Sequence, residues 1–202
     1  MRPALGLLLA PGAGADRNQS ALVAIDRDVT AAGAVAVRMD FPYRRAGRRS
    51  PDRAPVLISA VRDEAAALAK RCERLVMGGR SMGGRMCSMA AAEGMGVAGL
   101  VLISYPLHPP GRPDKRRVEH FPDLDCPCLF VSGSRDAFGS PLELEEATAA
   151  IPGVVTHRWI EGKDHGLRDC DADVSALVLD WLSDTGLLRR AAGAPGQPSR
   201  QP

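Results

Sequence analysis

Short apolar runs alternate with helical patterns along almost all of this 202-residue chain, and that alternation limits the fold more than any other feature. Six runs are predicted to be strands: 5–10, 34–39, 75–78, 99–104, 128–132 and 154–160. The first five are almost continuously apolar, as in strands that helices cover on both faces. The pattern predicts an α/β fold with a mostly parallel central sheet of about six strands, helices on both faces and right-handed crossovers.

Five amphipathic stripes lie between or after these runs, at residues 22–29, 57–68, 82–89, 141–150 and 174–182. The fourth opens with Ser140-Pro141-Leu142-Glu143, a capping box with proline at the first helical position. The third carries Met82, Met86 and Met89, which we interpret as core filling rather than as part of a cofactor site.

The composition is that of a globular protein, with 45% hydrophobic and 25% charged residues. We predict a single domain over residues 1–190 and a disordered tail over 191–202, because the tail is rich in Pro, Gly and Ser. The net charge of +2 favours neither a nucleic-acid partner nor an anionic membrane. No apolar run approaches the roughly 18 residues of a membrane span, and nothing in the pattern indicates an oligomeric state.

The cysteines and the N-terminus favour a cytoplasmic protein. The five cysteines are scattered, and the one close pair, Cys126 and Cys128, has neither zinc-site nor thioredoxin spacing. The start of the chain imitates a signal peptide, but Pro11 ends its apolar run after seven residues. We expect that run to stay in the protein as the first strand.

Two glycine-rich segments follow predicted strands, where ligands bind in parallel sheets. The first, Gly12-Ala13-Gly14-Ala15-Asp16-Arg17, begins like a dinucleotide fingerprint but has Arg17 at the third glycine position. The second, residues 78–85, lacks the Lys and Ser/Thr of a P-loop. Its Gly79-Arg80-Ser81-Met82-Gly83 stretch fits the G-x-S-x-G nucleophile elbow, a sharp turn that exposes a serine before a helix.

An acid and a histidine follow in the order that such a nucleophile requires. Asp136 comes after the fifth strand, and Ser140 already caps the next helix, so Asp136 has no capping role. His165 comes just after the sixth strand. The order Ser81, Asp136, His165 is that of nucleophile, acid and base in α/β-hydrolases, and all three lie at one sheet edge.

The remaining candidates fit these roles less well. His157 lies within a strand, while His108 and His120 lie between the fourth and fifth strands. Asp164 is the alternative acid, but a direct neighbour of His165 is poorly placed to orient its ring. Asp40 is expected to cap a turn or to pair with nearby arginines.

These motifs together resemble small bacterial α/β-hydrolases of the dienelactone-hydrolase-like group over residues 4–187. The resemblance is carried by residues 7–14, 38–43, 79–85, 133–136 and 164–166. It implies that the first glycine-rich loop forms an oxyanion hole with the backbone N–H groups of Ala13 and Met82. Members usually carry His-Gly where this chain has Pro11-Gly12, a difference that bears on how the loop is anchored. Dienelactone hydrolases proper use a cysteine nucleophile where this chain has Ser81.

We therefore predict a serine hydrolase that cleaves an ester-like or other acyl bond in a small-molecule substrate, with no metal or organic cofactor. The alternative is a non-catalytic binding or interaction module on the same fold. Residues 106–125 are the one segment where larger relatives insert a cap, so we expect no large cap and an open site. The basic loop at residues 44–49, with Arg80 and Arg85, is interpreted as solvated or paired charge rather than as a site for anionic substrates.

Overall fold

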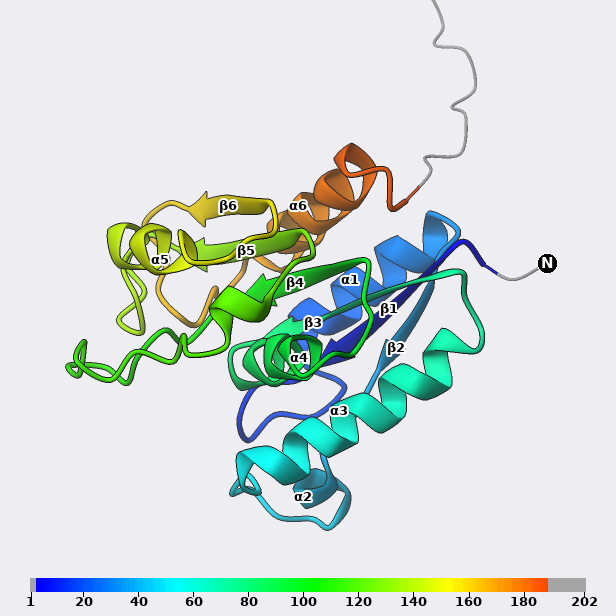
Figure 1. Cartoon of the computed structure of the whole chain (residues 1–202), viewed down its shortest axis with the longest axis horizontal. Helices are drawn as coiled ribbons and strands as arrows, with labels where there is room; N and C mark the ends of the chain where they lie inside the picture. Colours follow the sequence, from blue (N-terminus) through cyan, green and yellow to red (C-terminus); the bar gives the residue numbers. More distant parts are fainter. Residues whose placement is uncertain (1–2, 189–202) are drawn as a thin grey trace, which may run out of the picture.

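The computed structural model describes residues 3–188; the predicted tail at 191–202 lies outside this range. Its sheet has six strands, all parallel within the described residues, in the order β2-β1-β3-β4-β5-β6. Their bounds are Leu5–Ala10 (β1), Val35–Arg38 (β2), Arg74–Arg80 (β3), Gly99–Ile103 (β4), Cys128–Gly133 (β5) and Val155–Ile160 (β6). Because all six run the same way, their carboxyl ends meet at one edge of the sheet (Figure 1).

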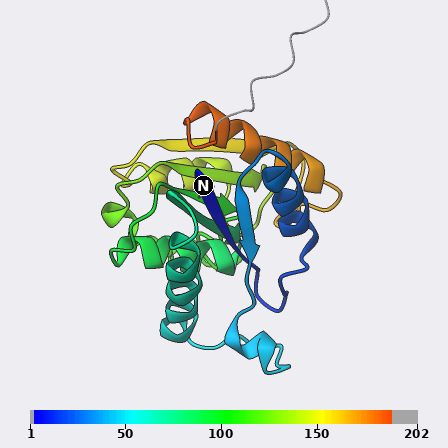
Figure 2. The same cartoon turned by 90° about the vertical axis from the view of Figure 1, so that its right-hand side faces the viewer.

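Helices cover both faces of the sheet. The five main ones are α1 (Ser20–Ala31), α3 (Ala54–Ala69), α4 (Met82–Ala92), α5 (Pro141–Thr148) and α6 (Asp171–Asp184). Two short elements join them, α2 (Pro42–Arg45) and the 3-10 helix η1 (Phe121–Asp123). Figure 2 shows α1 and α6 together on one side of the sheet, with α3 and α4 on the other. The predicted α/β fold with helices on both faces is confirmed.

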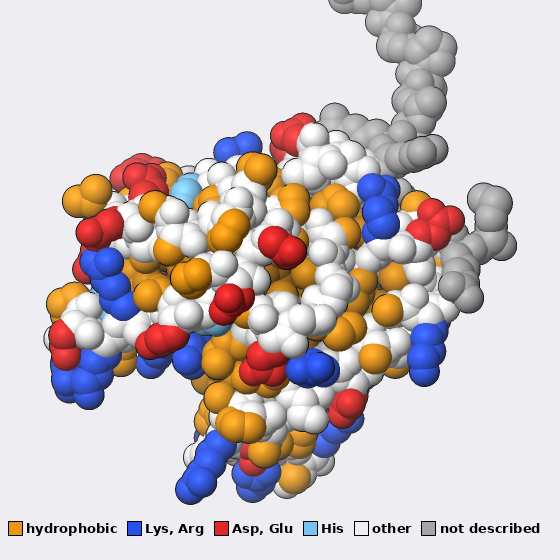
Figure 3. All heavy atoms as spheres, viewed as in Figure 1, with side chains coloured by type: hydrophobic (Ala, Val, Ile, Leu, Met, Phe, Trp, Pro, Cys, Tyr) orange, Lys and Arg blue, Asp and Glu red, His pale blue; other side chains and the backbone are white. Residues whose placement is uncertain are grey.

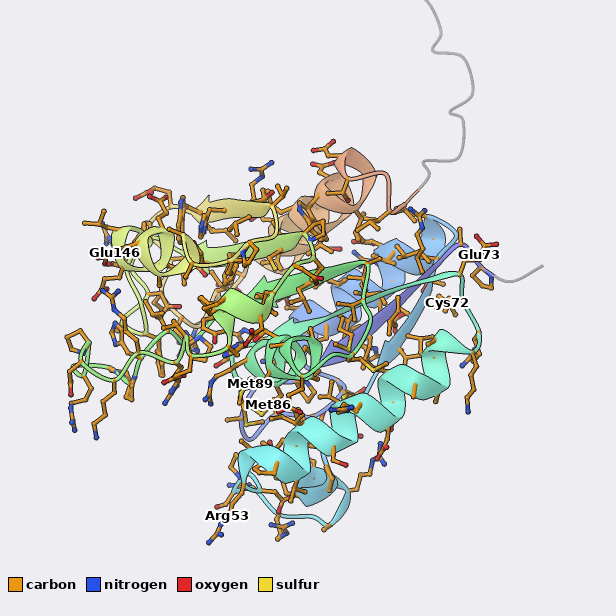
Figure 4. The ribbon with its side chains drawn as sticks, viewed as in Figure 1. Arg53, Cys72, Glu73, Met86, Met89 and Glu146 are labelled. Atoms are coloured by element: carbon orange, nitrogen blue, oxygen red, sulfur yellow. The ribbon has the colours of Figure 1, made fainter. Side chains whose placement is uncertain are left out.

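Each face has its own hydrophobic core, because alternate residues of each strand point to opposite sides. Side chains of α1 and α6, such as Leu22, Ile25 and Trp181, pack on one face. Side chains of α3, α4 and α5 pack on the other, where Met86 and Met89 lie between α4 and α3 (Figure 4). All three methionines pack in or against this core as predicted: Met86 is buried, while Met82 and Met89 are half-buried, and Met82 also lines the cavity described below.

The predicted strand positions agree with the structure to within one residue, except for β3. That strand extends to Arg80, because Gly78 and Gly79 are needed for close backbone approach rather than for ending the strand. The short helix α2 was not predicted, and it takes up the first part of the basic segment 44–49. None of the helices in residues 3–188 is long and apolar enough to cross a membrane.

Segment 106–125 leads from the carboxyl end of β4 back to the start of β5 and carries no helix of its own except η1. It is held down by aromatic packing, since Phe121 contacts both Tyr105 and Phe130. Figure 3 shows Lys and Arg side chains gathered at this end of the molecule, with acidic side chains among them. A large cap is absent from the described residues, as expected.

Candidate active site

Ser81 sits on a strained turn between β3 and α4. Its φ of 51° and ψ of −118° lie outside the usual regions for a residue with a side chain. The glycines on either side leave room for this turn. A Cβ at Gly79 would lie 2.1 Å from the carbonyl oxygen of Ala10, and one at Gly83 would lie 2.2 Å from the same atom. The G-x-S-x-G spacing is therefore set by contact with the end of β1.

Asp136, His165 and Ser81 form one hydrogen-bonded row at the carboxyl edge of the sheet. Oδ2 of Asp136 lies 2.8 Å from Nδ1 of His165, and Nε2 of His165 lies 2.9 Å from Oγ of Ser81. The side chain of Asp136 is 1% exposed and that of His165 is 23% exposed. The carboxylate is thus shielded from water, while the imidazole stays within reach of a small molecule.

Phe138 holds this row from the side and was not identified from the sequence. Its ring stacks on that of His165, with centroids 4.0 Å apart. Its backbone N–H donates to Oδ1 of Asp136 over 2.8 Å. Asp136 therefore forms a local turn with one carboxylate oxygen and meets the imidazole with the other. As expected, Ser140 and not Asp136 caps the next helix, but Asp136 also stabilises this turn, which was not predicted from the sequence.

Arg80, the residue before Ser81, holds the backbone that carries His165. Its Nη2 donates to the carbonyl oxygens of His165 and Gly166 over 2.7 and 2.6 Å. Burial lowers the pKa of Arg80, while the carboxylates of Asp171, Asp136 and Asp164 oppose that shift. The guanidinium of Arg80 therefore links the end of β3 to the loop that carries His165.

The first glycine-rich loop lies beside Ser81 and leaves two backbone donors unused. Neither the N–H of Ala13 nor that of Met82 has an acceptor among the described residues. Gly12 N–H donates to Oε1 of Gln19 over 2.9 Å, and Gly14 N–H donates to the Tyr43 hydroxyl over 3.0 Å. These side chains anchor the loop that Pro11-Gly12 begins, and the sequence alone did not reveal them.

A cavity of about 490 Å³ opens over the serine. Its lining joins the two glycine-rich turns, the histidine, Phe138 and segment 106–125. The residues are Gly12, Ala13, Gln19, Arg80, Ser81, Met82, Arg85, Pro106, Arg117, Phe138 and His165. Ser81 and His165 line the cavity, whereas the shielded Asp136 does not. Ala13 and Met82, the two residues predicted to supply oxyanion donors, line it as well.

The rejected candidates have other partners. Asp164 accepts from the N–H of Gly166, and Asp40 pairs with Arg17 over 2.6 Å. His157 lies 2.9 Å from Oγ1 of Thr148, and His108 is buried 3.5 Å from Glu143. All five cysteines are buried and none is in a disulfide bond. Residues 3–188 hold no cluster of three His, Cys, Asp or Glu side chains suited to a metal.

The basic segment mostly pairs with acids, as interpreted from the sequence. Arg48 lies 2.7 Å from Asp52, and Arg44 lies 3.5 Å from Asp16. Arg45 pairs with Glu64. These contacts place much of the positive charge of residues 44–49 in surface ion pairs, away from the residues that line the cavity.

His120 forms a second serine–histidine contact, with Nε2 2.8 Å from Oγ of the buried Ser88. Burial lowers the pKa of His120 to about 4, and the positive charge of Arg85 contributes less to this shift. Because the unfolded chain takes up this proton near pH 6.5 and the folded chain only near pH 4, stability falls as the pH drops between those values. We expect the protonation of His120 in the unfolded chain to lower the free energy of unfolding by about 2 kcal/mol between pH 7 and pH 5.

Urea unfolding at the two pH values measures this loss, with His120→Gln as the comparison. The variant is expected to lose less stability than the parent on acidification. Equal losses in the two proteins would show that His120 does not carry the effect.

Comparisons with known proteins agree with this architecture. A solved dienelactone hydrolase from Anabaena variabilis is 18% identical, with a TM-score of 0.72 over 90% of this chain and 87% of its own. A monoacylglycerol lipase from Paleococcus ferrophilus is 13% identical, with a TM-score of 0.72 over 89% of this chain and 94% of its own. A structure from work on the metagenome-derived lipolytic enzymes LipS and LipT is 16% identical, with a TM-score of 0.75 over 91% of this chain and 95% of its own. At these identities the likeness shows the fold.

Family membership rests on the sequence itself. The family model described as alpha/beta hydrolase domain matches residues 3–175, most of the chain, and this range includes every member of the Asp136–His165–Ser81 row. This match confirms the predicted resemblance to α/β-hydrolases, and the solved dienelactone hydrolase shares the fold. The chain belongs to the alpha/beta hydrolase domain family and is a hydrolase.

Proposed function

We propose that this protein is a serine hydrolase that cleaves an ester-like or other acyl bond in a small molecule, with Ser81, His165 and Asp136 as its catalytic triad. The observation that carries the proposal is the hydrogen-bonded row from Asp136 through His165 to Ser81, which ends in the cavity. Two unused backbone donors at Ala13 and Met82 border the same space and support an acyl-transfer mechanism.

The first half-reaction follows from the donors and acceptors in this row. Nδ1–H of His165 donates to Asp136, which leaves Nε2 free to accept the Ser81 proton. As Oγ of Ser81 bonds to the substrate carbonyl carbon, the carbonyl oxygen gains negative charge. The N–H groups of Ala13 and Met82 then hold that oxygen, and each such donor contributes about 100- to 1,000-fold in rate.

Departure of the leaving group completes the first half-reaction, and attack by water is the second, which restores the enzyme. The imidazolium gives its proton to the leaving-group oxygen as the bond to the carbonyl carbon breaks, and an acyl-Ser81 ester remains. His165 next takes a proton from a water molecule whose oxygen attacks the acyl carbon. The Ser81 alkoxide leaves and recovers the proton, so that the products are one acid and one alcohol.

Arg80 is a positioning residue in this proposal. Two non-glycine residues in the loop after His165, Leu167 and Asp169, have positive φ, so the loop needs external contacts to keep its strained shape. The paired contacts from Arg80 supply them. We expect Arg80→Met to lower kcat about 10- to 100-fold, with Arg80→Lys intermediate because ammonium lacks the planar fork.

Steady-state kinetics over pH 5–9 measures this effect. A positioning role predicts that kcat falls more than KM rises and that the lysine variant recovers part of kcat. A purely structural role would lower the melting temperature and leave kcat per folded molecule unchanged, which would contradict the proposal.

The direct test of the function is a panel of p-nitrophenyl esters of increasing acyl length, followed by thioester, lactone and amide substrates. We expect turnover of at least one short ester, and we expect it to depend on Ser81. The alternative, a binding module on the same fold, predicts no turnover of any of them. We place the enzyme in the cytoplasm as part of the proposal, because the apolar run at residues 5–10 is the buried strand β1 and no disulfide bond joins the five buried cysteines.

A further inference from the structure

The cavity over Ser81 is lined by cations without any acid. Arg80, Arg85 and Arg117 contribute to its lining, and none of the residues that line it is Asp or Glu. Arginine is the side chain best suited to bind planar oxyanion groups, because its guanidinium presents paired N–H donors. The charge of this lining therefore bears on which substrates the cavity admits.

The three arginines differ in what already binds them. Arg80 is taken up by two backbone carbonyls and faces three carboxylates. Arg85 and Arg117 have no carboxylate within ion-pair distance in residues 3–188. The Nε of Arg85 is buried and has no hydrogen-bond partner, and Arg117 has one long side-chain contact, 3.4 Å to the carbonyl oxygen of Pro106.

The backbone of Arg85 and that of Arg117 are both held by hydrogen bonds close to Ser81. The N–H of Arg85 donates to the carbonyl oxygen of Ser81 over 3.1 Å, so Arg85 lies one helical turn after Ser81, in the first turn of α4. The backbone of Arg117 is bonded on both sides: its N–H donates to Leu107 over 2.8 Å, and its carbonyl accepts from the Tyr105 hydroxyl over 2.7 Å. A ligand therefore meets these guanidinium groups without a large loop movement.

The positions of Arg85 and Arg117 are electrostatically unfavourable as long as no anion is bound. Arg85 lies near the positive end of the α4 dipole, and that first turn holds no acidic residue to offset it. Burial lowers the pKa of Arg117, and the charge of Arg85 lowers it further, so the two cations repel one another. An anion bound between them would relieve both costs.

We propose that Arg85 and Arg117 form an anion-binding subsite, and that the substrate is an ester bearing a carboxylate or phosphate group. The inference rests on the proposed function and adds a substrate class to it. Since both arginines line the same cavity of about 490 Å³ as Ser81, the anionic group lies within a few bonds of the cleaved ester. The subsite lies at α4 and segment 106–125, away from the paired arginines of residues 44–49.

Matched ester pairs test the proposal. For the acyl side, the 4-nitrophenyl monoester of succinate is compared with 4-nitrophenyl butanoate. For the leaving-group side, the acetyl esters of 4-hydroxybenzoate and of 4-hydroxyphenyl phosphate are compared with 4-methylphenyl acetate, which also separates carboxylate from phosphate. We expect kcat/KM to favour the anionic member about 10- to 100-fold in at least one pair, and Arg85→Gln and Arg117→Gln each to reduce that ratio about 10-fold or more.

Arg116→Gln is the matched control. Arg116 neighbours Arg117 in sequence but pairs over 2.8 Å with Glu146, on the outer side of α5 (Figure 4), and it does not line the cavity. Its loss is expected to leave the preference unchanged. Equal rates on the charged and neutral esters, or a preference that survives both glutamine variants, would overturn the subsite while leaving the hydrolase proposal intact.

Calorimetric titration with succinate and with phenyl phosphate tests the subsite without turnover. We expect at least one of the two to bind the parent protein and to bind Arg85→Gln and Arg117→Gln at least 10-fold more weakly. Binding in a protein that cleaves no ester would support the subsite and count against the proposed function. No binding of either anion would overturn the subsite.

Discussion

Replacement of Ser81 by alanine is expected to lower kcat for ester hydrolysis by about 10⁴- to 10⁶-fold, with little change in KM. The alanine removes the oxygen that Nε2 of His165 contacts, so no acyl-enzyme forms. The remaining backbone donors at Ala13 and Met82 still bind the carbonyl oxygen, which accounts for residual rate above water. Initial rates with a short p-nitrophenyl ester measure the loss.

Ser88→Ala is the matched control for this prediction. Ser88 lies on the same helix and also touches a histidine, His120, but it is fully buried and does not line the cavity. We expect this variant to keep most of its activity, with folding checked by circular dichroism. Activity that survived in Ser81→Ala would move the chemistry to another residue.

Replacement of Asp136 by asparagine is expected to lower kcat about 10³- to 10⁴-fold at neutral pH. The amide oxygen can still accept the N–H of Phe138, so the local turn is retained. The amide nitrogen then faces Nδ1 of His165 as a donor, which favours the ring tautomer with its proton on Nε2. That tautomer cannot take the proton from Ser81.

Asp164→Asn separates the two acids that adjoin His165 in space or sequence. Asp164 accepts from the Gly166 N–H and has no hydrogen bond to the imidazole. Its amide retains that acceptor, so we expect a change in kcat of less than about 10-fold. A larger loss in Asp164→Asn than in Asp136→Asn would reverse the assignment of the acid. The pH dependence of both variants is measured with the same ester.

The fold could be predicted from the sequence because a buried parallel strand needs apolar residues on both faces. Runs such as Leu5–Ala10 therefore stand out from the polar segments around them. The relation between Ser81, Asp136 and His165 followed from the same argument, because parallel strands bring the loops at their carboxyl ends together. Chain order and strand position were sufficient to expect these three residues near one another.

Other parts of the site depend on contacts that have no local pattern. Tyr43 reaches the first glycine-rich loop from the short helix α2, 29 residues away in sequence. Phe138 is an ordinary loop residue until its ring is seen against His165. A clue for Phe138 was present in its spacing, since a residue two after an Asp commonly donates to that carboxylate.

The arginines illustrate the limit of reading charge from sequence. Arg48 and Arg85 look alike in the chain, yet Arg48 pairs with Asp52 while Arg85 has no acidic partner in the described residues. Nothing in the sequence distinguishes Arg117 from Arg112 and Arg116 in the same segment, both of which pair with acids. Whether a cation is neutralised depends on the three-dimensional position of carboxylates, and composition does not record it.

The most direct test of the account is to react the protein with a fluorophosphonate and to locate the adduct by mass spectrometry of its peptides. Fluorophosphonates phosphonylate a serine whose hydroxyl is activated by a neighbouring base. We expect one adduct, on Ser81. It should be absent in Ser81→Ala, form more slowly in Asp136→Asn and form at the parent rate in Ser88→Ala. An adduct on another residue, or no adduct in a protein that hydrolyses esters, would contradict the account.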